Sequence, residues 1–129
     1  MAKQKKRWKI LVIDDEPTLC NALRDKLTQA NFDVRIAHNG SEGLEQCGVE
    51  RPDLILLDLL MPEMDGIQFL KSLRALASGQ EIPVFILTNL NEPDKMQGAL
   101  KYGAYDFFIK SDWPIDEIVK KVAARLKKI

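Results

Sequence analysis

The chain has 129 residues, of which 46% are hydrophobic and 29% are charged, which is typical of a single globular domain. Its 19 lysine and arginine residues balance 19 aspartate and glutamate residues, so the charge argues against a nucleic-acid-binding protein. No apolar run approaches the roughly 20 residues of a membrane helix, and the N-terminus lacks the apolar stretch of a secretory signal. We therefore expect a cytoplasmic domain over residues 8–129, preceded by a solvated basic tail over 1–7.

The first half of the chain predicts three strands separated by two helices. The segment "WKILVID" (8–14) is a short apolar run and predicts a buried strand, after which Pro17 suits the first turn of a helix. "FDVRIAH" (32–38) alternates as a half-buried strand does, and Ser41 is expected to cap a helix that stops before Pro52. "DLILLD" (53–58) is apolar without alternation, which indicates a strand covered on both faces in a parallel sheet.

The second half repeats the alternation. Gly66 opens a predicted helix that Gly79 ends, and "IPVFILT" (82–88) predicts another doubly buried strand. Asn91 is expected to cap the next helix and Gly103 to end it, before a fifth strand, "AYDFFIK" (104–110), and a last amphipathic helix. Five strand–helix units are too few for an eight-stranded barrel. They predict an α/β fold with an open, doubly wound, five-stranded parallel sheet.

Polar residues of particular kinds follow the strands expected in the middle of the sheet. Asp14 and Asp15 end the first strand, Asp58 ends the third, Thr88 the fourth and Lys110 the fifth. Each residue alone is more often a solvated turn or helix cap. The carboxyl ends of parallel strands meet at one edge of the sheet, however, and ligands of doubly wound folds bind there. We therefore treat the five residues as one candidate site.

The chemistry of this set points to phosphoryl transfer with a metal. Two carboxylates ~4 Å apart repel by about 4 kcal/mol at an effective dielectric constant near 20. One lysine does not offset three such groups, and an all-oxygen site suits Mg²⁺. An aspartate can accept a phosphoryl group as a nucleophile. Thr88 and Lys110 are suited to contact the oxygens of that group.

Four motifs carry a resemblance to a known family. They are "VIDDEP" (12–17), "LLDLLMPEMDG" (56–66), "ILT" (86–88) and "FFIK" (107–110). With them the chain resembles the receiver domain of two-component response regulators over about residues 8 to 128. The resemblance implies a flavodoxin-like sheet with strand order 2-1-3-4-5. It also implies a Mg²⁺-dependent signalling switch, not an enzyme with a separate substrate, that is phosphorylated by a histidine kinase, a phosphotransfer protein or a small phosphodonor.

The resemblance assigns the acceptor and the metal ligands residue by residue. Asp58 corresponds to the aspartate that accepts the phosphoryl group and also contacts the metal. Asp15 corresponds to a direct Mg²⁺ ligand, and Asp14 to the acid that holds the ion beside it. The backbone carbonyl of Leu60 would complete the protein ligands.

The same resemblance implies how the signal leaves the domain. Thr88 corresponds to the switch hydroxyl, Lys110 to the ammonium that pairs with the phosphoryl group, and Phe107 to the aromatic that rotates inward. Signals are expected to pass through residues 91–128 to a downstream protein or output domain. Phosphorylation-dependent dimerisation and the identity of the kinase stay open, as does the choice between a stand-alone receiver and part of a larger regulator or hybrid kinase.

Three positions depart from the family pattern. Ser111 replaces the proline that usually follows the lysine, so we expect a trans peptide bond and a reshaped loop over 111–114, because a cis bond before a non-proline residue costs ~2.5–4 kcal/mol. Asn89 replaces a very small residue, which leaves the dephosphorylation rate open. Phe107 has no hydroxyl group, so an inward switch would depend on packing alone.

Other classes of protein fit less well. A haloacid-dehalogenase-type phosphatase needs a second acid two residues after its nucleophile, where this chain has Leu60. A flavodoxin needs a phosphate-binding first loop, whereas "DDEPT" (14–18) would repel a phosphate. A degenerate receiver that serves only as a binding module is disfavoured because every chemical group is present.

Overall fold

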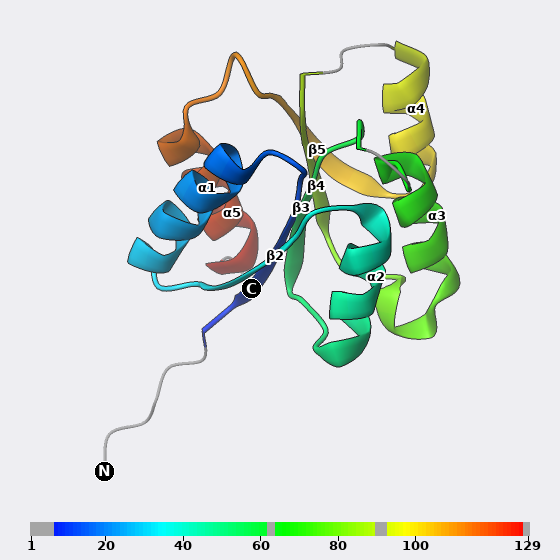
Figure 1. Ribbon diagram of the computed structural model, residues 1–129, viewed down its shortest axis with the longest axis horizontal. Helices are drawn as coiled ribbons and strands as arrows, with labels where there is room; N and C mark the ends of the chain where they lie inside the picture. Colours follow the sequence, from blue (N-terminus) through cyan, green and yellow to red (C-terminus); the bar gives the residue numbers. More distant parts are fainter. Residues whose placement is uncertain (1–6, 62–63, 90–92, 128–129) are drawn as a thin grey trace.

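The computed structural model describes residues 7–61, 64–89 and 93–127, which form five strand–helix units (Figure 1). The elements in chain order are β1 (Lys9–Ile13), α1 (Pro17–Gln29), β2 (Asp33–Ala37), α2 (Gly40–Val49), β3 (Leu54–Leu57), α3 (Gly66–Ala75), the 3-10 turn η1 (Ala77–Gly79), β4 (Val84–Thr88), α4 (Pro93–Lys101), β5 (Ala104–Ile109) and α5 (Ile115–Lys127). Most of the predicted basic tail lies outside the described residues. Within the described ranges, no helix has the length and apolar character needed to cross a membrane.

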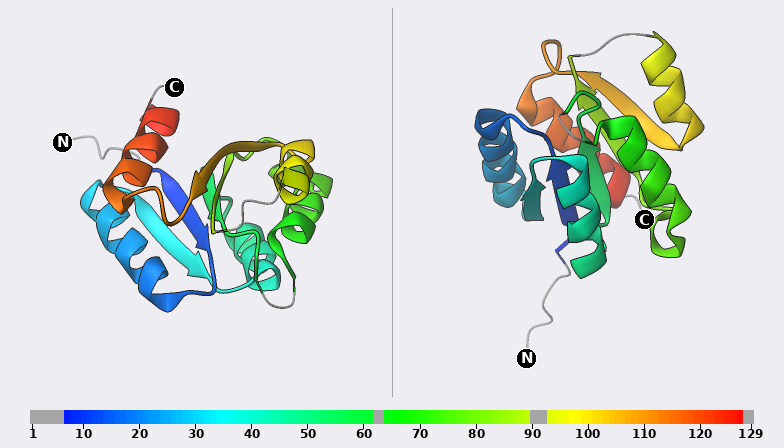
Figure 2. Two further views of the ribbon diagram at one scale, coloured as in Figure 1. Left: turned by 90° about the horizontal axis from the view of Figure 1, so that it is seen from above. Right: turned by 45° about the vertical axis from the view of Figure 1, so that its right-hand side comes forward.

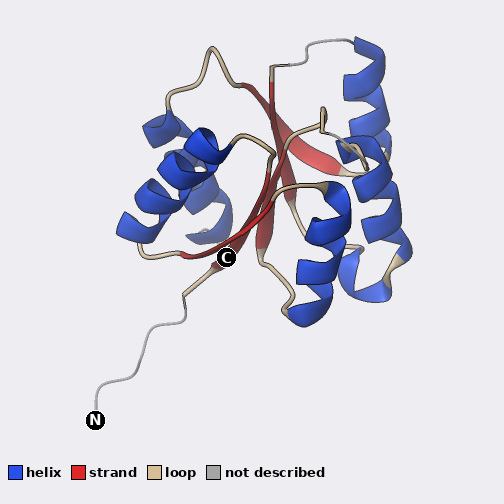
Figure 3. Cartoon of the chain, viewed as in Figure 1, coloured by secondary structure: helices blue, strands red, loops and turns tan. Residues whose placement is uncertain are grey.

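All neighbouring strands are parallel, in the order β2-β1-β3-β4-β5, which confirms the predicted fold. Helices α1 and α5 cover one face of the sheet, and α2, α3 and α4 cover the other (Figures 1 and 3). Figure 2 shows the sheet, seen from above, as a twisted layer between these two groups of helices. The arrangement leaves the carboxyl ends of β1, β3, β4 and β5 together at one edge.

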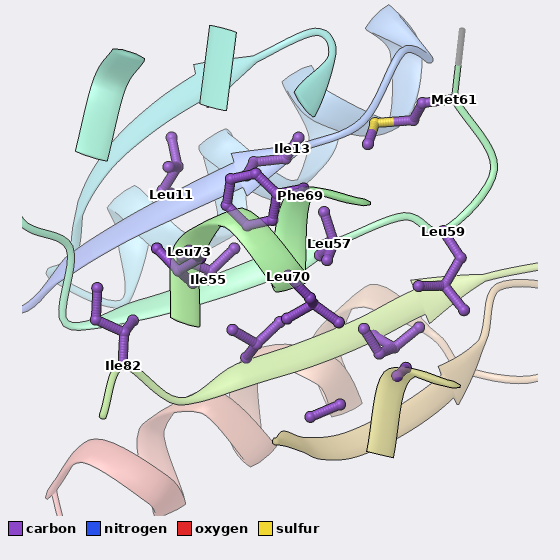
Figure 4. Close-up of a cluster of buried hydrophobic side chains, with 14 of the residues drawn as sticks. Leu11, Ile13, Ile55, Leu57, Leu59, Met61, Phe69, Leu70, Leu73 and Ile82 are labelled. Atoms are coloured by element: carbon purple, nitrogen blue, oxygen red, sulfur yellow. The ribbon is translucent and has the colours of Figure 1, made fainter. Parts of the chain in front are cut away.

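Each face of the sheet has its own hydrophobic core. The core between the sheet and helices α2, α3 and α4, called here the α2–α4 core, contains Phe69, Leu70 and Leu73 of α3, which lie over the strands (Figure 4). The core between the sheet and helices α1 and α5, called here the α1–α5 core, contains the helix residues Cys20, Leu23, Leu27, Ile118, Val122 and Leu126. Strand β3 supplies both cores, because Ile55 and Leu57 belong to the first and Leu54 and Leu56 to the second. The prediction that this strand is buried on both faces is confirmed.

Helix boundaries follow local capping, with some differences from the sequence-based expectation. Helix α2 begins one residue before Ser41, and the cap is Asn39, whose side chain accepts a hydrogen bond of 2.8 Å from the Glu42 backbone. Asparagine caps as well as serine does, so the expected cap at Ser41 was wrong. Helix α3 ends at Ala75, four residues before the predicted end at Gly79, because Leu76 has an extended backbone that interrupts the helix. A separate 3-10 turn, η1, occupies the remaining residues up to Gly79.

Helix α4 is followed by Gly103, whose φ of +81° is in the left-handed region that glycine tolerates, as expected for a residue that ends a helix. The expected cap of α4 at Asn91 lies outside the described residues. The Lys110–Ser111 peptide bond is trans, as predicted.

Candidate functional site

The five predicted site residues lie at the carboxyl edge of the sheet, uppermost in Figure 1. Most of them border one pocket of about 470 Å³, which is lined by Asp15, Glu16, Asp58, Leu60, Met61, Thr88, Asn89 and Lys110. The site is therefore assembled from the ends of four strands and the loops that follow them, as the strand-end rule predicts.

Three carboxylates form its acidic part. Asp14, Asp15 and Asp58 each offer an oxygen atom within 4.8 Å of the others. Asp14 and Asp58 are buried, with exposed fractions of 2% and 5%, whereas Asp15 is exposed. Burial raises the pKa of Asp14 above its usual range and the charge of Asp58 adds to this, although hydrogen bonds from Lys110 and the Glu16 backbone oppose it. Proximity and burial make this cluster costly without a cation.

Lys110 places one ammonium group among these acids. Its Nζ atom lies 2.7 Å from Oδ2 of Asp14, 3.1 Å from Oδ2 of Asp58 and 3.4 Å from Oε1 of Glu16. Burial opposes the charged form, but the hydrogen bond to Asp14 and the negative charges of Asp58 and Asp14 outweigh it and raise the pKa of Lys110. The group therefore stays protonated at neutral pH and ties the end of β5 to the ends of β1 and β3.

Backbone contacts hold Asp58 at the end of β3. Its amide donates to the carbonyl of Ile13 (3.0 Å), and one of its carboxylate oxygens accepts from the amide of Leu60 (3.2 Å). The first residue of α3, Gly66, packs against the chain just after Asp58. A Cβ atom at Gly66 would lie 2.6 Å from the Asp58 carbonyl oxygen and 2.6 Å from Cα of Leu59. Glycine is needed here because the helix start and the acceptor loop are in direct backbone contact.

The two predicted switch residues lie on neighbouring strands but in different surroundings. Thr88 is 1% exposed, ends β4 and borders the pocket. Its carbonyl accepts a hydrogen bond of 2.9 Å from the Lys110 amide, which aligns the ends of β4 and β5. Phe107 on β5 is half-buried against the α2–α4 core and does not line the pocket.

Two pocket residues were missed by sequence reasoning. Glu16 directly follows Asp15, so the run of acids over 14–16 contained the signal, but its contact with Lys110 depends on the fold. Met61 is 8% exposed and lines the pocket beside Leu60, a residue that is 68% exposed. No charge or spacing in the sequence distinguishes Met61 from an ordinary core residue.

The donor set fits a hard divalent cation. Three carboxylates within reach of one another supply the oxygen ligands that Mg²⁺ prefers. Lys110 brings a single positive charge to Asp14, Asp58 and Glu16, so the group of four residues keeps a net negative charge while these acids are ionised.

An open sheet of order 2-1-3-4-5 with an acidic cluster, a hydroxyl and an ammonium at its carboxyl edge is the architecture of a two-component receiver. The family model of the response regulator receiver domain matches residues 10–123, and the chain belongs to this family. It is therefore a receiver domain with a phospho-accepting signalling role. Membership of this family sets aside the phosphatase and flavodoxin alternatives.

Individual relatives agree with the family. The chain is 32% identical over 120 residues to response regulator MprA of Mycobacterium ulcerans (strain Agy99), which corresponds to 93% of this chain and 50% of that protein. The chain thus spans about half the length of the curated relatives it matches.

Solved structures are similar as well. The chemotaxis protein CheY4 of Vibrio cholerae superposes with a TM-score of 0.87 at 27% identity, covering 94% of this chain and 100% of that one. The signal receiver domain of a histidine kinase from Syntrophus aciditrophicus superposes with a TM-score of 0.79 at 32% identity, covering 95% and 94%.

Proposed function

We propose that Asp58 is the residue that accepts the phosphoryl group, from a histidine kinase or a phosphotransfer protein. An oxygen of the Asp58 carboxylate attacks phosphorus while the bond from phosphorus to the donor's imidazole nitrogen breaks, and that nitrogen keeps the electron pair. The observation that supports this role is the position of the carboxylate, which is buried at the end of a rigid strand and 3.1 Å from the Lys110 ammonium.

The remaining groups have complementary roles in this proposal. Lys110 pairs with a phosphoryl oxygen, and the Thr88 hydroxyl donates to another. Asp15, Asp58 and the Leu60 carbonyl would ligate Mg²⁺, with Asp14 beside them. When bound, the ion would neutralise negative charge on the phosphoryl oxygens. The close approach of the three carboxylates supports this assignment.

The output step of the proposal runs through β4 and β5. Phosphorylation adds about −1.5 to −2 charge units at neutral pH, which draws Thr88 towards Asp58 and frees space for Phe107 to turn inward. Phe107 pairs in register with Ile86, which precedes Thr88 by two residues on β4. A shift of Thr88 could therefore reach Phe107 through the paired strands β4 and β5. The surface over 91–128 would then change its affinity for an output domain, a downstream protein or a second copy of the chain.

Phosphorylation with a small donor tests the acceptor. We expect the chain to gain one phosphoryl group from acetyl phosphate and Mg²⁺, detected by intact mass, and to lose it on treatment with hydroxylamine, which cleaves acyl phosphates. Asp58→Asn should abolish the gain, whereas Asp25→Asn, which changes an exposed aspartate on α1, should not. Equal phosphorylation of Asp58→Asn, or none of the unaltered chain, would refute the assignment, and the second result would favour a degenerate receiver.

Magnesium titration tests the metal ligands separately. Asp15→Asn should weaken Mg²⁺ binding at least tenfold, about 1.4 kcal/mol, because it removes a charged ligand from an all-oxygen site. Isothermal titration with MgCl₂ measures the affinity, and Asp25→Asn again serves as the control. Unchanged affinity in Asp15→Asn would contradict the proposed coordination.

A further inference from the structure

The connection from β5 to α5 begins at Lys110 itself. The Lys110 amide bonds to Thr88, and the next hydrogen bond, from the Asp112 amide to the Ile109 carbonyl (2.9 Å), closes a turn around Lys110 and Ser111. The Lys110–Ser111 bond is trans. The loop therefore needs a contact of its own to hold its shape, because Ser111 has neither the fixed φ nor the ring of a proline.

Trp113 supplies such a contact. Its half-buried ring packs edge-on against Phe108, with ring centroids 4.9 Å apart and an interplanar angle of 80°. Phe108 is 1% exposed and packs in turn against Phe85 of β4, at 5.6 Å between centroids. The ring also has a cation near it, because Nζ of Lys121 from α5 lies 5.8 Å from the ring centre. Edge-to-face aromatic pairs of this kind have a preferred geometry as well as a large contact area.

Lys110 is thus held between two residues of the same aromatic group. Phe108 is two residues before it and Trp113 three residues after it, and both belong to the α1–α5 core. The Lys110 side chain is 8% exposed and must reach Asp14, Asp58 and Glu16 at once. A long, flexible side chain meets three partners reliably when its backbone is fixed on both sides.

We propose that Trp113 is a positioning residue: its packing on Phe108 fixes the loop over 111–114 and so holds the Lys110 ammonium between Asp14 and Asp58. The consequence for phosphorylation rests on the proposed function of Asp58. The consequence for Lys110 does not, because it is measurable in the metal-free, unphosphorylated protein.

Lysine acetylation tests the position of Lys110 directly. The full chain is treated with a limiting amount of an acetylating ester, and the modification of Lys110 is followed by peptide mass spectrometry. Trp113→Ala should speed this modification about tenfold or more, because local opening exposes a protected group. Trp113→Phe, which keeps an aromatic edge, should restore slow modification.

Trp8 provides the matched control. It is also half-buried against the α1–α5 core, but it precedes β1, at the opposite edge of the sheet. Trp8→Ala should leave the modification of Lys110 unchanged. Equal rates in Trp113→Ala and the unaltered chain, or equal acceleration in Trp8→Ala, would overturn the proposal. If Trp113→Ala does not fold, as judged by circular dichroism, Trp113→Leu replaces it, because leucine keeps apolar bulk without the ring edge.

Phosphorylation kinetics test the consequence for the site. Trp113→Ala should lower the rate with acetyl phosphate about ten- to a hundredfold, the loss expected when a reacting geometry shifts by about 1 Å. The Mg²⁺ affinity should not weaken, since Asp14, Asp15 and Asp58 lie outside this loop. In a Lys110→Met background, Trp113→Ala should cause no further loss, whereas additive losses would refute action through Lys110. If the unaltered chain takes up no phosphoryl group, the proposed function fails while the acetylation result still decides the role of Trp113.

Discussion

At the scale of single residues, Lys110 is the cation that makes the acidic site compatible with folding. It brings its ammonium group within 2.7 Å of Asp14 and 3.1 Å of Asp58, and both carboxylates are buried. If one partner of a buried charged group is removed, the remaining charge is left uncompensated, and the fold is weakened. The stability of the domain and its proposed affinity for Mg²⁺ would therefore be coupled through one side chain.

Lys110→Met should make this coupling visible. Without Mg²⁺, we expect the free energy of unfolding to fall by about 3 kcal/mol at neutral pH, because Asp14 and Asp58 then repel each other without compensation. Added Mg²⁺ should recover most of the loss and should bind more tightly than in the unaltered chain. Urea unfolding at several MgCl₂ concentrations measures both effects. Equal stability of the two proteins without Mg²⁺ would contradict the proposed charge balance.

Cys47 is a half-buried thiol whose ionisation should affect stability at high pH. Burial raises the pKa of its thiol from 9.0 to about 11. The folded state thus holds this proton more tightly than the unfolded state, so the contribution is complete below pH 9 and is lost as the pH rises towards 11. Over this window we expect a loss of about 2 kcal/mol attributable to Cys47.

The measurement compares the pH dependence of urea unfolding in the unaltered chain and in Cys47→Ala. The free energy of unfolding of the variant should be lower by a constant amount, because the packing contacts of the thiol group are lost. Its stability should nevertheless decline less steeply between pH 9 and 11. Parallel curves would show that this thiol does not carry the effect. Cys20, whose pKa burial also raises to about 11, is present in both proteins and cancels in the comparison.

At the scale of secondary structure elements, the start of α3 determines the position of the loop after Asp58. The helix has a capping box. The Asp65 side chain accepts a hydrogen bond from the backbone N–H of Gln68 (2.9 Å), and the Gln68 side-chain oxygen accepts one from the backbone N–H of Asp65 (3.3 Å). Its first residue, Gly66, bonds to the Leu59 carbonyl at 3.0 Å. The helix start and the acceptor loop therefore form one rigid unit.

Gly66→Ala should disturb this unit. The added Cβ would lie 2.6 Å from backbone atoms of Asp58 and Leu59, so the helix or the loop must move. We expect a loss of about 1–3 kcal/mol in stability, together with slower phosphorylation. Gly48→Ala is the matched control, since nothing lies within 4 Å of its Cβ position in α2, and it should stabilise the domain by about 0.5–1 kcal/mol. Urea unfolding distinguishes the two, and equal effects would argue against a tight contact at Gly66.

Much of this level of structure was predictable from local patterns. The unbroken apolar run of β3 indicated burial on both faces. The polar residues at the carboxyl ends of β1, β3, β4 and β5 indicated the candidate site, because strand ends meet at one edge in any doubly wound sheet. The contact between Trp113 and Phe108 was not predictable, since it depends on side-chain directions across a turn. The bridge from Lys110 to Asp14 joins residues at opposite ends of the chain. Its geometry depends on the twist and register of the whole sheet.

At the scale of the whole molecule, the sheet separates two cores that meet at the site. Strand β5 contributes adjacent aromatics to opposite faces, Phe107 to the α2–α4 core and Phe108 to the α1–α5 core. Under the proposals above, Phe108 and Trp113 keep Lys110 in place on one face, and Phe107 is free to respond on the other. The residues that hold Lys110 in place and the residue that moves in the switch would thus lie on opposite faces of the same strand, β5.

The double burial of β3 also has a consequence before folding is complete. The segment 54–60, "LILLDLL", carries one charge, at Asp58, and no proline or glycine. Segments of this composition aggregate when they are exposed, and a single charged residue within the segment reduces this aggregation. We expect Asp58→Asn to scatter more light than Asp25→Asn when both are diluted from urea at the same concentration. Equal scattering would contradict this role. The carboxylate proposed to carry the signal would also protect the newly made chain from self-association.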